Sequence, residues 1–202
     1  MNQIIEPHAF GTYAPPGAEI LIIGTFPTHK RNWAFEFFYP NPQNVFWEIL
    51  GRVYGYSFQF SADKEAVDER KEFAKLHKIA LTDMIAKAIR DEDASGDDQL
   101  IPVEIMDILC ILKDNTAIRR IVLTSRSGKN GALSLFKCHL IANKIAFSSS
   151  ELNNFIVGNF VRFNKKYEVI VPYSPSPRVK KRFGINLLID MYRSALTCNF
   201  ET

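Results

Sequence analysis

The sequence has no long hydrophobic run and few cysteines. No stretch of 18 or more apolar residues occurs, so we expect neither a transmembrane helix nor a membrane partner. The start of the chain, MNQIIEPHAF, lacks the basic stretch and apolar core of a secretory signal, which predicts a cytoplasmic protein. Cys110, Cys138 and Cys198 lie far apart and form no CxxC pair. We therefore expect buried structural thiols rather than a disulfide framework, a zinc site or an iron–sulfur cluster.

Patterns for metal binding and for histidine-based catalysis are also missing. His8, His29, His77 and His139 do not cluster in the sequence. Neither a metal site nor a histidine-based triad is predicted, and no cofactor is expected. No repeat, low-complexity tract or linker divides the 202 residues, so we expect a single domain over residues 1–202 and a monomer.

Neither sign of charge dominates the chain. The 25 Lys and Arg residues against 22 Asp and Glu residues leave a net charge of +3, which is too small to establish a nucleic-acid partner. Basic residues do follow three predicted strands, at His29–Arg31, at Arg126 with Lys129, and at Arg178–Arg182. Charges gather on loops simply because loops are solvated. Their position on equivalent strand-to-helix turns nevertheless favours one positive face.

Apolar runs alternate with helical periods along the chain. Strands are predicted at 20–23, 79–82, 119–124, 155–163 and 167–171, the last two forming a pair. Helices are predicted at 42–54, 61–77, 84–90, from Pro102 through Cys110, at 132–143 and at 181–196. This alternation predicts a three-layer α/β/α fold with a short, mainly parallel central sheet.

Residues 18–50 hold the densest set of polar and aromatic side chains. The first strand ends at Gly24 and is followed by a long loop to position 41, a length that usually indicates function. Asn41 as N-cap and Pro42 as first helical residue would place Asn44 in the first turn, near unpaired amide hydrogens. Ligands of such sheets bind beyond the carboxyl ends of the strands, so the loops after 23, 123 and 171 should meet at one crevice.

Four short motifs occur in order along the chain. The first strand ends in Gly-x-x-Pro at 24–27, and YPNPQNVFW follows at 39–47. A middle block pairs an aliphatic strand with Asp83 and an acidic loop, and a Ser/Pro-rich loop at 174–177 precedes the last helix. Together they resemble the uracil-DNA glycosylase superfamily, most closely its hypoxanthine-DNA and mismatch-type branches.

The sequence differs from the usual pattern of the superfamily at two positions. Asn41 stands where these branches usually carry His. Phe26 stands where many members of the superfamily place a catalytic Asp or Asn. The hypoxanthine-type branch also has an apolar residue there and is understood to use the Asn of its PxN motif. The resemblance therefore assigns catalysis to Asn44.

The implied activity is a DNA glycosylase. It would flip uracil or hypoxanthine out of DNA and hydrolyse the N-glycosidic bond, leaving an abasic site without a metal. Asp83 would support the pocket. The base-binding residues would be Gly24, Thr25, Phe26, Pro27, Tyr39, Phe38 and Asn41. The DNA-binding residues would be Lys30, Arg31, Ser125, Lys129, Ser174, Ser176, Arg178 and Lys181.

Simpler interpretations stay open for several of these residues. Asn41 fits a helix cap better than a base contact, and Tyr39 fits a core position as well as a stacking one. The alternative function is a catalytically weak or inactive nucleic-acid-binding member of the same fold. A third is a small-molecule α/β enzyme that binds phosphate at 125–129.

Overall fold

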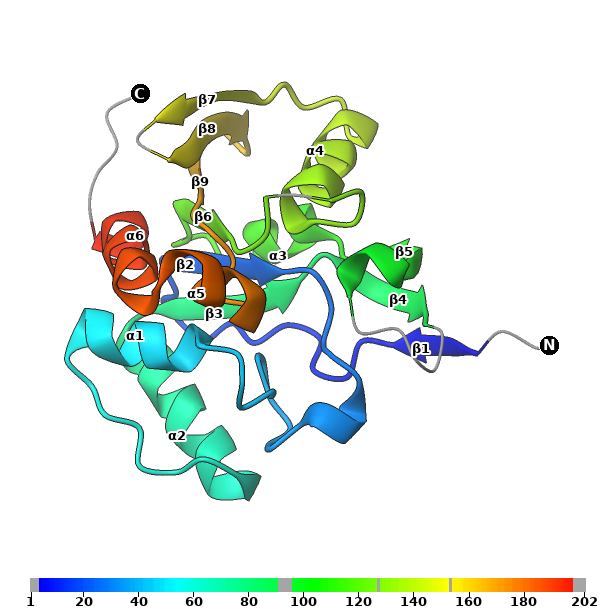
Figure 1. Cartoon of the computed structure of the whole chain (residues 1–202). Helices are drawn as coiled ribbons and strands as arrows, with labels where there is room; N and C mark the ends of the chain where they lie inside the picture. The colour runs from blue at the N-terminus through cyan, green and yellow to red at the C-terminus, as the bar shows by residue number, and fades with distance from the viewer. Residues whose placement is uncertain (1–3, 91–95, 127, 153, 198–202) are drawn as a thin grey trace.

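A six-stranded mixed sheet forms the centre of the protein (Figure 1). The computed structural model describes residues 4–90, 96–126, 128–152 and 154–197. Parallel pairing joins neighbouring strands in the order β3, β2, β6, β9, and β8 and β7 continue the sheet by antiparallel pairing. The strands are β2 (Ile20–Gly24), β3 (Ile79–Asp83), β6 (Arg120–Leu123), β7 (Ser148–Leu152), β8 (Phe155–Arg162) and β9 (Lys165–Val171). The predicted α/β class and the predicted hairpin of the last two apolar runs are confirmed.

Helices cover both faces of this sheet (Figure 1). On one face lie α1 (Phe46–Tyr54), α2 (Asp63–Leu76) and α6 (Ile185–Thr197). On the other lie α3 (Ile108–Asp114) and α4 (Ala132–Ala142). None of the described helices is long and apolar enough to cross a membrane.

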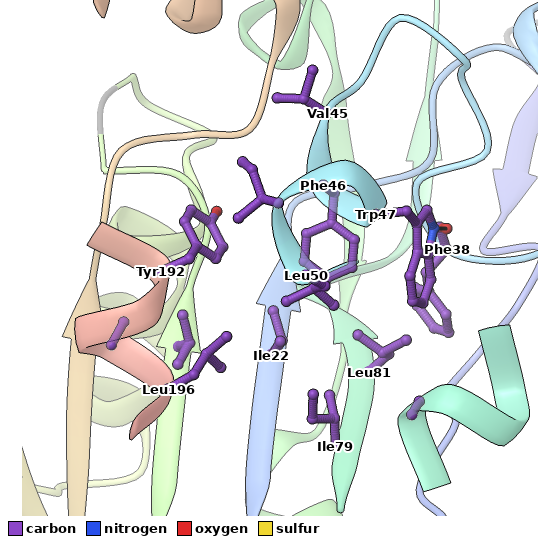
Figure 2. Packing of buried hydrophobic residues seen from close by; sticks show 14 of the residues in the cluster. Ile22, Phe38, Val45, Phe46, Trp47, Leu50, Ile79, Leu81, Tyr192 and Leu196 are labelled. Atoms are coloured by element: carbon purple, nitrogen blue, oxygen red, sulfur yellow. Dashed lines mark hydrogen bonds between the residues drawn. The ribbon is translucent and has the colours of Figure 1, made fainter. Parts of the chain in front are cut away.

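The two faces explain why the central strands read as continuous apolar runs. Ile22 of β2 packs into the cluster under α1, whereas its neighbours Leu21 and Ile23 pack into the cluster under α3 and α4. Because each of these side chains is buried against one face of the sheet or the other, β2 shows no alternation of apolar and polar residues. Figure 2 shows Phe46 and Leu50 of α1 stacked over Ile22.

A small antiparallel sheet lies beside the main one, and sequence reasoning missed it. It consists of β1 (Ile5–Pro7), β4 (Ile85–Ile89) and β5 (Ile101–Ile105). Helices had been expected at 84–90 and from Pro102, and both predictions were wrong. Ala and Lys in β4 favour a helix locally, but pairing with β1 on one side and β5 on the other overrides that preference.

Several helix boundaries also differ from the prediction. α1 begins at Phe46 rather than near Pro42, because Asn41 closes a turn onto the amide of Gln43 and caps no helix. The single predicted last helix is two, α5 (Pro177–Phe183) and α6, separated by Gly184 with φ 80°. Short 3₁₀ turns, η1 (Lys30–Asn32) and η2 (Asp97–Gln99), lie in the loops. The predicted helix at 132–143 is confirmed as α4.

The cysteine prediction was wrong where it can be checked. Cys110 and Cys138 are exposed rather than buried in the core. Both sit on helices whose inward faces are filled by larger side chains, such as Leu109 and Phe136. Cys198 lies outside the described residues.

Candidate functional site

The carboxyl ends of β2, β3 and β6 meet at one edge of the sheet. Gly24 pairs with Asp83, and Thr124 follows β6, with its amide donating to the carbonyl of Ile23 at 3.0 Å. A side chain at Gly24 would collide with Asp83 Oδ1 and would lie 3.1 Å from the hydroxyl of Tyr39. Glycine is therefore required here, because a carboxylate and a phenol both approach its backbone.

Tyr39 joins the first loop to the end of β6. Its hydroxyl is 2.9 Å from the Thr124 hydroxyl, and one face of its ring stacks on Phe46 with centroids 3.7 Å apart. Burial, followed by the charge of Asp83, raises the pKa of Tyr39 well above its usual value, so the phenol stays neutral. The residue as a whole is half-buried.

Phe38 lies deeper than its neighbour. It is 1 % exposed, and its ring packs against His8, Phe10 and Phe37. Such a ring forms the wall of the aromatic core beneath the loop rather than a surface on which a base can stack.

The turn at 24–27 is anchored from one side. The carbonyls of Gly24 and Thr25 accept the amides of Met84 and Ile85 at 3.0 and 3.1 Å. Within the described part of the chain, no backbone hydrogen bond uses the amide of Thr25 or that of Phe26. Two backbone donors at the edge of the sheet therefore have no backbone partner among the described residues, and both residues are buried.

Arg90 holds the far end of the same turn, a role that the sequence does not indicate. Its guanidinium donates to the Pro27 carbonyl at 2.5 Å and pairs with Glu6 at 2.9 Å. It also lies over the ring of Phe26, 5.3 Å from the centroid. The Phe26 residue is buried, with 7 % of its surface exposed.

A second carboxylate approaches the turn from η2. Burial, the largest cause, together with the charges of Asp83 and Asp98 raises the pKa of Asp97 to about 6, although the Thr25 hydroxyl and Arg90 act to lower it. Asp97 as a whole residue is exposed, so the burial that raises its pKa is that of the carboxyl group alone. Among the described residues the buried Thr25 hydroxyl makes no hydrogen bond of good geometry, although it lies close enough to the Asp97 carboxyl group to affect its pKa. This acidic side of the edge was not predicted.

His8 and Asp83 form a buried pair that was also missed. The Nε2 atom of His8 lies 2.7 Å from Asp83 Oδ2, and the two side chains are 2 % and 8 % exposed. The Nδ1 atom accepts the amides of Phe10 and Gly11 at 3.1 and 2.8 Å. The partners are 75 positions apart. No local signal in the lead-in marks His8, so only the fold reveals the pair.

Asn44 lies at the start of α1, where its carboxamide is partly used. Its Oδ1 accepts the amide of Phe46 at 2.9 Å, and its own amide donates to the Asn41 carbonyl at 2.9 Å. The next amide, that of Val45, donates to Pro175 at 3.1 Å. The PxN motif therefore contacts the Ser/Pro-rich loop that follows β9, although 130 residues separate them in the chain.

The loop after β9 is shaped by its two serines. Ser174 Oγ accepts the amide of Ser176, and Ser176 Oγ caps α5 by accepting the amide of Val179 at 3.4 Å. Both hydroxyl hydrogens stay available for an anion. Arg178 and Lys181 are exposed on the short helix that follows.

In each of the other two loops, one basic residue is paired within the protein and another is exposed. Lys30 pairs with Glu36 at 2.9 Å, while Arg31 is exposed beside it. Arg126 donates to the Asn154 carbonyl and lies over the ring of Tyr173, so it is not available for a phosphate. Lys129 is exposed.

The proposed phosphate turn at 125–129 has unfavourable surroundings. The Asp98 carboxylate lies against Gly128, where it would repel an anion. α4 begins only at Ala132, so the turn does not lead directly into a helix N-terminus. These features weigh against the small-molecule phosphate enzyme considered above.

A cavity of about 570 Å³ lies away from the strand ends, between η1 and α2. Its walls mix charges of both signs, including Lys30, Glu36, Asp63 and Lys71 around Trp33 and Phe35. None of the strand-end residues described above lines it. In the described part of the chain, no group of three or more His, Cys, Asp or Glu side chains is placed to hold a metal ion.

No protein-family model, curated protein or solved structure matches the chain. The functional argument therefore depends on the geometry at the strand ends and on the motifs themselves.

Proposed function

We propose that the protein is a monofunctional DNA glycosylase that hydrolyses the N-glycosidic bond of a flipped, deaminated base, uracil or hypoxanthine. The observation that supports it best is the meeting of three distant segments at one edge of the sheet. Tyr39 bonds to Thr124 and lies beside Gly24, while Val45 bonds to Pro175. The segments of Gly24, Tyr39 and Pro175 carry motifs that resemble the superfamily, and Asp83 of the middle motif pairs with Gly24. The superfamily's three-layer arrangement around a mainly parallel sheet is part of the proposal.

The reaction depends more on binding the base than on covalent catalysis. As the bond breaks, the sugar becomes cationic and the base leaves as an anion, so hydrogen-bond donors aimed at the base lower the barrier. The amides of Thr25 and Phe26 are such donors. Phe46 covers one face of the Tyr39 ring, and the opposite face would supply the stacking surface for the base. Ser174, Ser176, Arg178 and Lys181 hold the DNA backbone, with salt-dependent affinity.

Asn44 has a specific task in this scheme. Its carbonyl oxygen accepts the Phe46 amide, and no described residue accepts a hydrogen bond from its side-chain NH2 group, so those two hydrogens can serve a ligand. We assign it as a donor to the carbonyl oxygen of the departing base, where negative charge develops. It acts most strongly in the transition state for that reason.

The test is release of free base from DNA duplexes that contain a single uracil or hypoxanthine. We expect the wild type to release base, and Asn44→Ala to do so about 10²-fold more slowly in single turnover, the usual cost of losing one such donor. The control is Asn143→Ala, which removes an exposed carboxamide after α4 and should leave the rate unchanged. Equal rates for wild type and Asn44→Ala would remove Asn44 from catalysis. No release of any deaminated base by the wild type would overturn the proposal.

The second candidate is a nucleic-acid-binding protein that has lost the chemistry. It is favoured by the buried ring of Phe26, which cannot position water where many members of the superfamily carry an acid or amide. It predicts DNA binding with no base release from uracil, thymine, hypoxanthine or xanthine lesions. The same panel of duplexes therefore separates the two candidates.

A further inference from the structure

The proposed reaction requires an acceptor for the attacking water, and the motifs do not provide one. Phe26 is apolar, and the carbonyl oxygen of Asn44 is already bonded to the amide of Phe46. A water molecule that attacks the sugar must lose a proton, and an oxygen at this edge of the sheet that accepts the proton would accelerate the step.

Asp83 offers the best-placed oxygen. It ends β3 directly beside Gly24, and its two carboxylate oxygens have different surroundings. Oδ2 is bonded to His8, whereas Oδ1 lies against Gly24 and accepts no hydrogen bond from the described residues. The Tyr39 hydroxyl approaches the same point. A buried carboxylate thus keeps one oxygen free beside the turn whose amides we assign to the base.

His8 determines which oxygen is free. Two backbone amides donate to Nδ1, so that nitrogen carries no proton, and Nε2–H donates to Asp83 Oδ2. The rings of Phe10, Phe26 and Phe38 surround the imidazole at centroid distances of 5.6–5.8 Å. These rings and hydrogen bonds fix the position of the His8 imidazole, and the imidazole fixes the orientation of the Asp83 carboxylate.

We propose that Asp83 Oδ1 binds and deprotonates the attacking water and that His8 positions Asp83 for this step, an inference that rests on the proposed glycosylase function. The C1′–N bond breaks and its electron pair leaves with the base. The water oxygen forms the new bond to C1′, and its proton passes to Oδ1 and then to solvent. The anionic base takes a proton from solvent, so the step consumes one water and needs no other reactant.

A purely structural role for the pair is the rival explanation. Residues 5–13 are held to the ends of β3 and β4 by other contacts as well, including the β1–β4 pairing, the Tyr13–Leu81 bridge and the Thr12–Thr82 hydroxyl contact at 3.0 Å. We therefore expect conservative variants of the pair to fold, so that the two explanations can be separated by rate.

The experiment measures single-turnover base release and affinity for a duplex with an abasic-site analogue. Asp83→Asn should slow release about 10²-fold or more while affinity changes less than about threefold. Asp83→Ala should be equally slow and should be accelerated by added formate, which supplies a carboxylate to the vacated space. Formate should not accelerate wild type or Asn44→Ala. His8→Gln, which keeps an N–H donor, should retain more rate than His8→Leu.

The outcomes distinguish this inference from the function on which it rests. If the wild type releases no base, the glycosylase proposal fails and this inference fails with it. If the wild type is active and Asp83→Asn stays within about twofold of it, only this inference is overturned. It is also overturned if Asp83→Ala melts at a much lower temperature and formate restores no rate, because the pair is then a structural link alone.

Discussion

At the scale of single residues, the site depends on how closely groups approach Gly24. Asp83 and Tyr39 come from different parts of the chain and both reach the position that a side chain would occupy there. The sequence analysis assigned Gly24 to the base pocket from the Gly-x-x-Pro motif. It had no means to detect His8, whose partner is 75 positions away. Motifs locate residues whose neighbours lie in the same segment, whereas tertiary pairs appear only in the fold.

Replacing Gly24 by Ala should disturb both stability and activity. The added methyl group would force Asp83 and Tyr39 apart, and such overpacking costs about 1–3 kcal/mol. Urea unfolding would measure the loss, and base release should fall in parallel. Gly96→Ala is the control, because the closest atom to its added methyl group would be 3.8 Å away. A Gly24→Ala protein as stable as wild type would show that the edge is less tightly packed than described.

At the scale of elements, the buried strands were the most predictable part of the fold. Strands such as β2 are apolar throughout because both faces are covered, and that pattern identified them. β4 was predicted as a helix because its Ala and Lys residues suit one, and only pairing with β1 and β5 makes it a strand. The start of α1 was placed too early because Asn41 and Pro42, good helix-start residues, close a separate turn.

The short helix α5 should carry the electrostatic part of DNA binding. Arg178 and Lys181 are exposed on it, directly after the Ser/Pro-rich loop. Removing both by Arg178→Ala and Lys181→Ala should weaken binding to any duplex and reduce the slope of log K against log salt by about 2, close to one unit per lost phosphate contact.

The control for this measurement is the double variant Lys75→Ala and Lys113→Ala. Both lysines are exposed in the last turns of α2 and α3, which lead toward the opposite edge of the parallel strands. Their loss should leave the salt slope nearly unchanged. An unaltered slope for the α5 variant would place the DNA on another surface.

At the scale of the whole molecule, topology determines where chemistry is possible. Parallel pairing of β3, β2 and β6 brings Asp83, Gly24 and Thr124 to one edge, and Val45 draws the loop after β9 toward it. We expected these loops to meet, because ligands bind at the carboxyl ends of strands in such sheets. The acidic contribution of Asp97 was not predicted, because that carboxylate lies in the connection between β4 and β5 of the small sheet, which sequence reasoning missed.

The most direct test of the central claim is the structure of the protein bound to a duplex containing 2′-fluoro-2′-deoxyuridine or its hypoxanthine counterpart, which resist cleavage. We predict that the modified base leaves the helix and lies between the turn at 24–27 and Tyr39. Asn44 should donate to a base oxygen, and a water should rest on Asp83 Oδ1. A base that stays stacked in the duplex, or DNA bound away from this edge, would contradict the account.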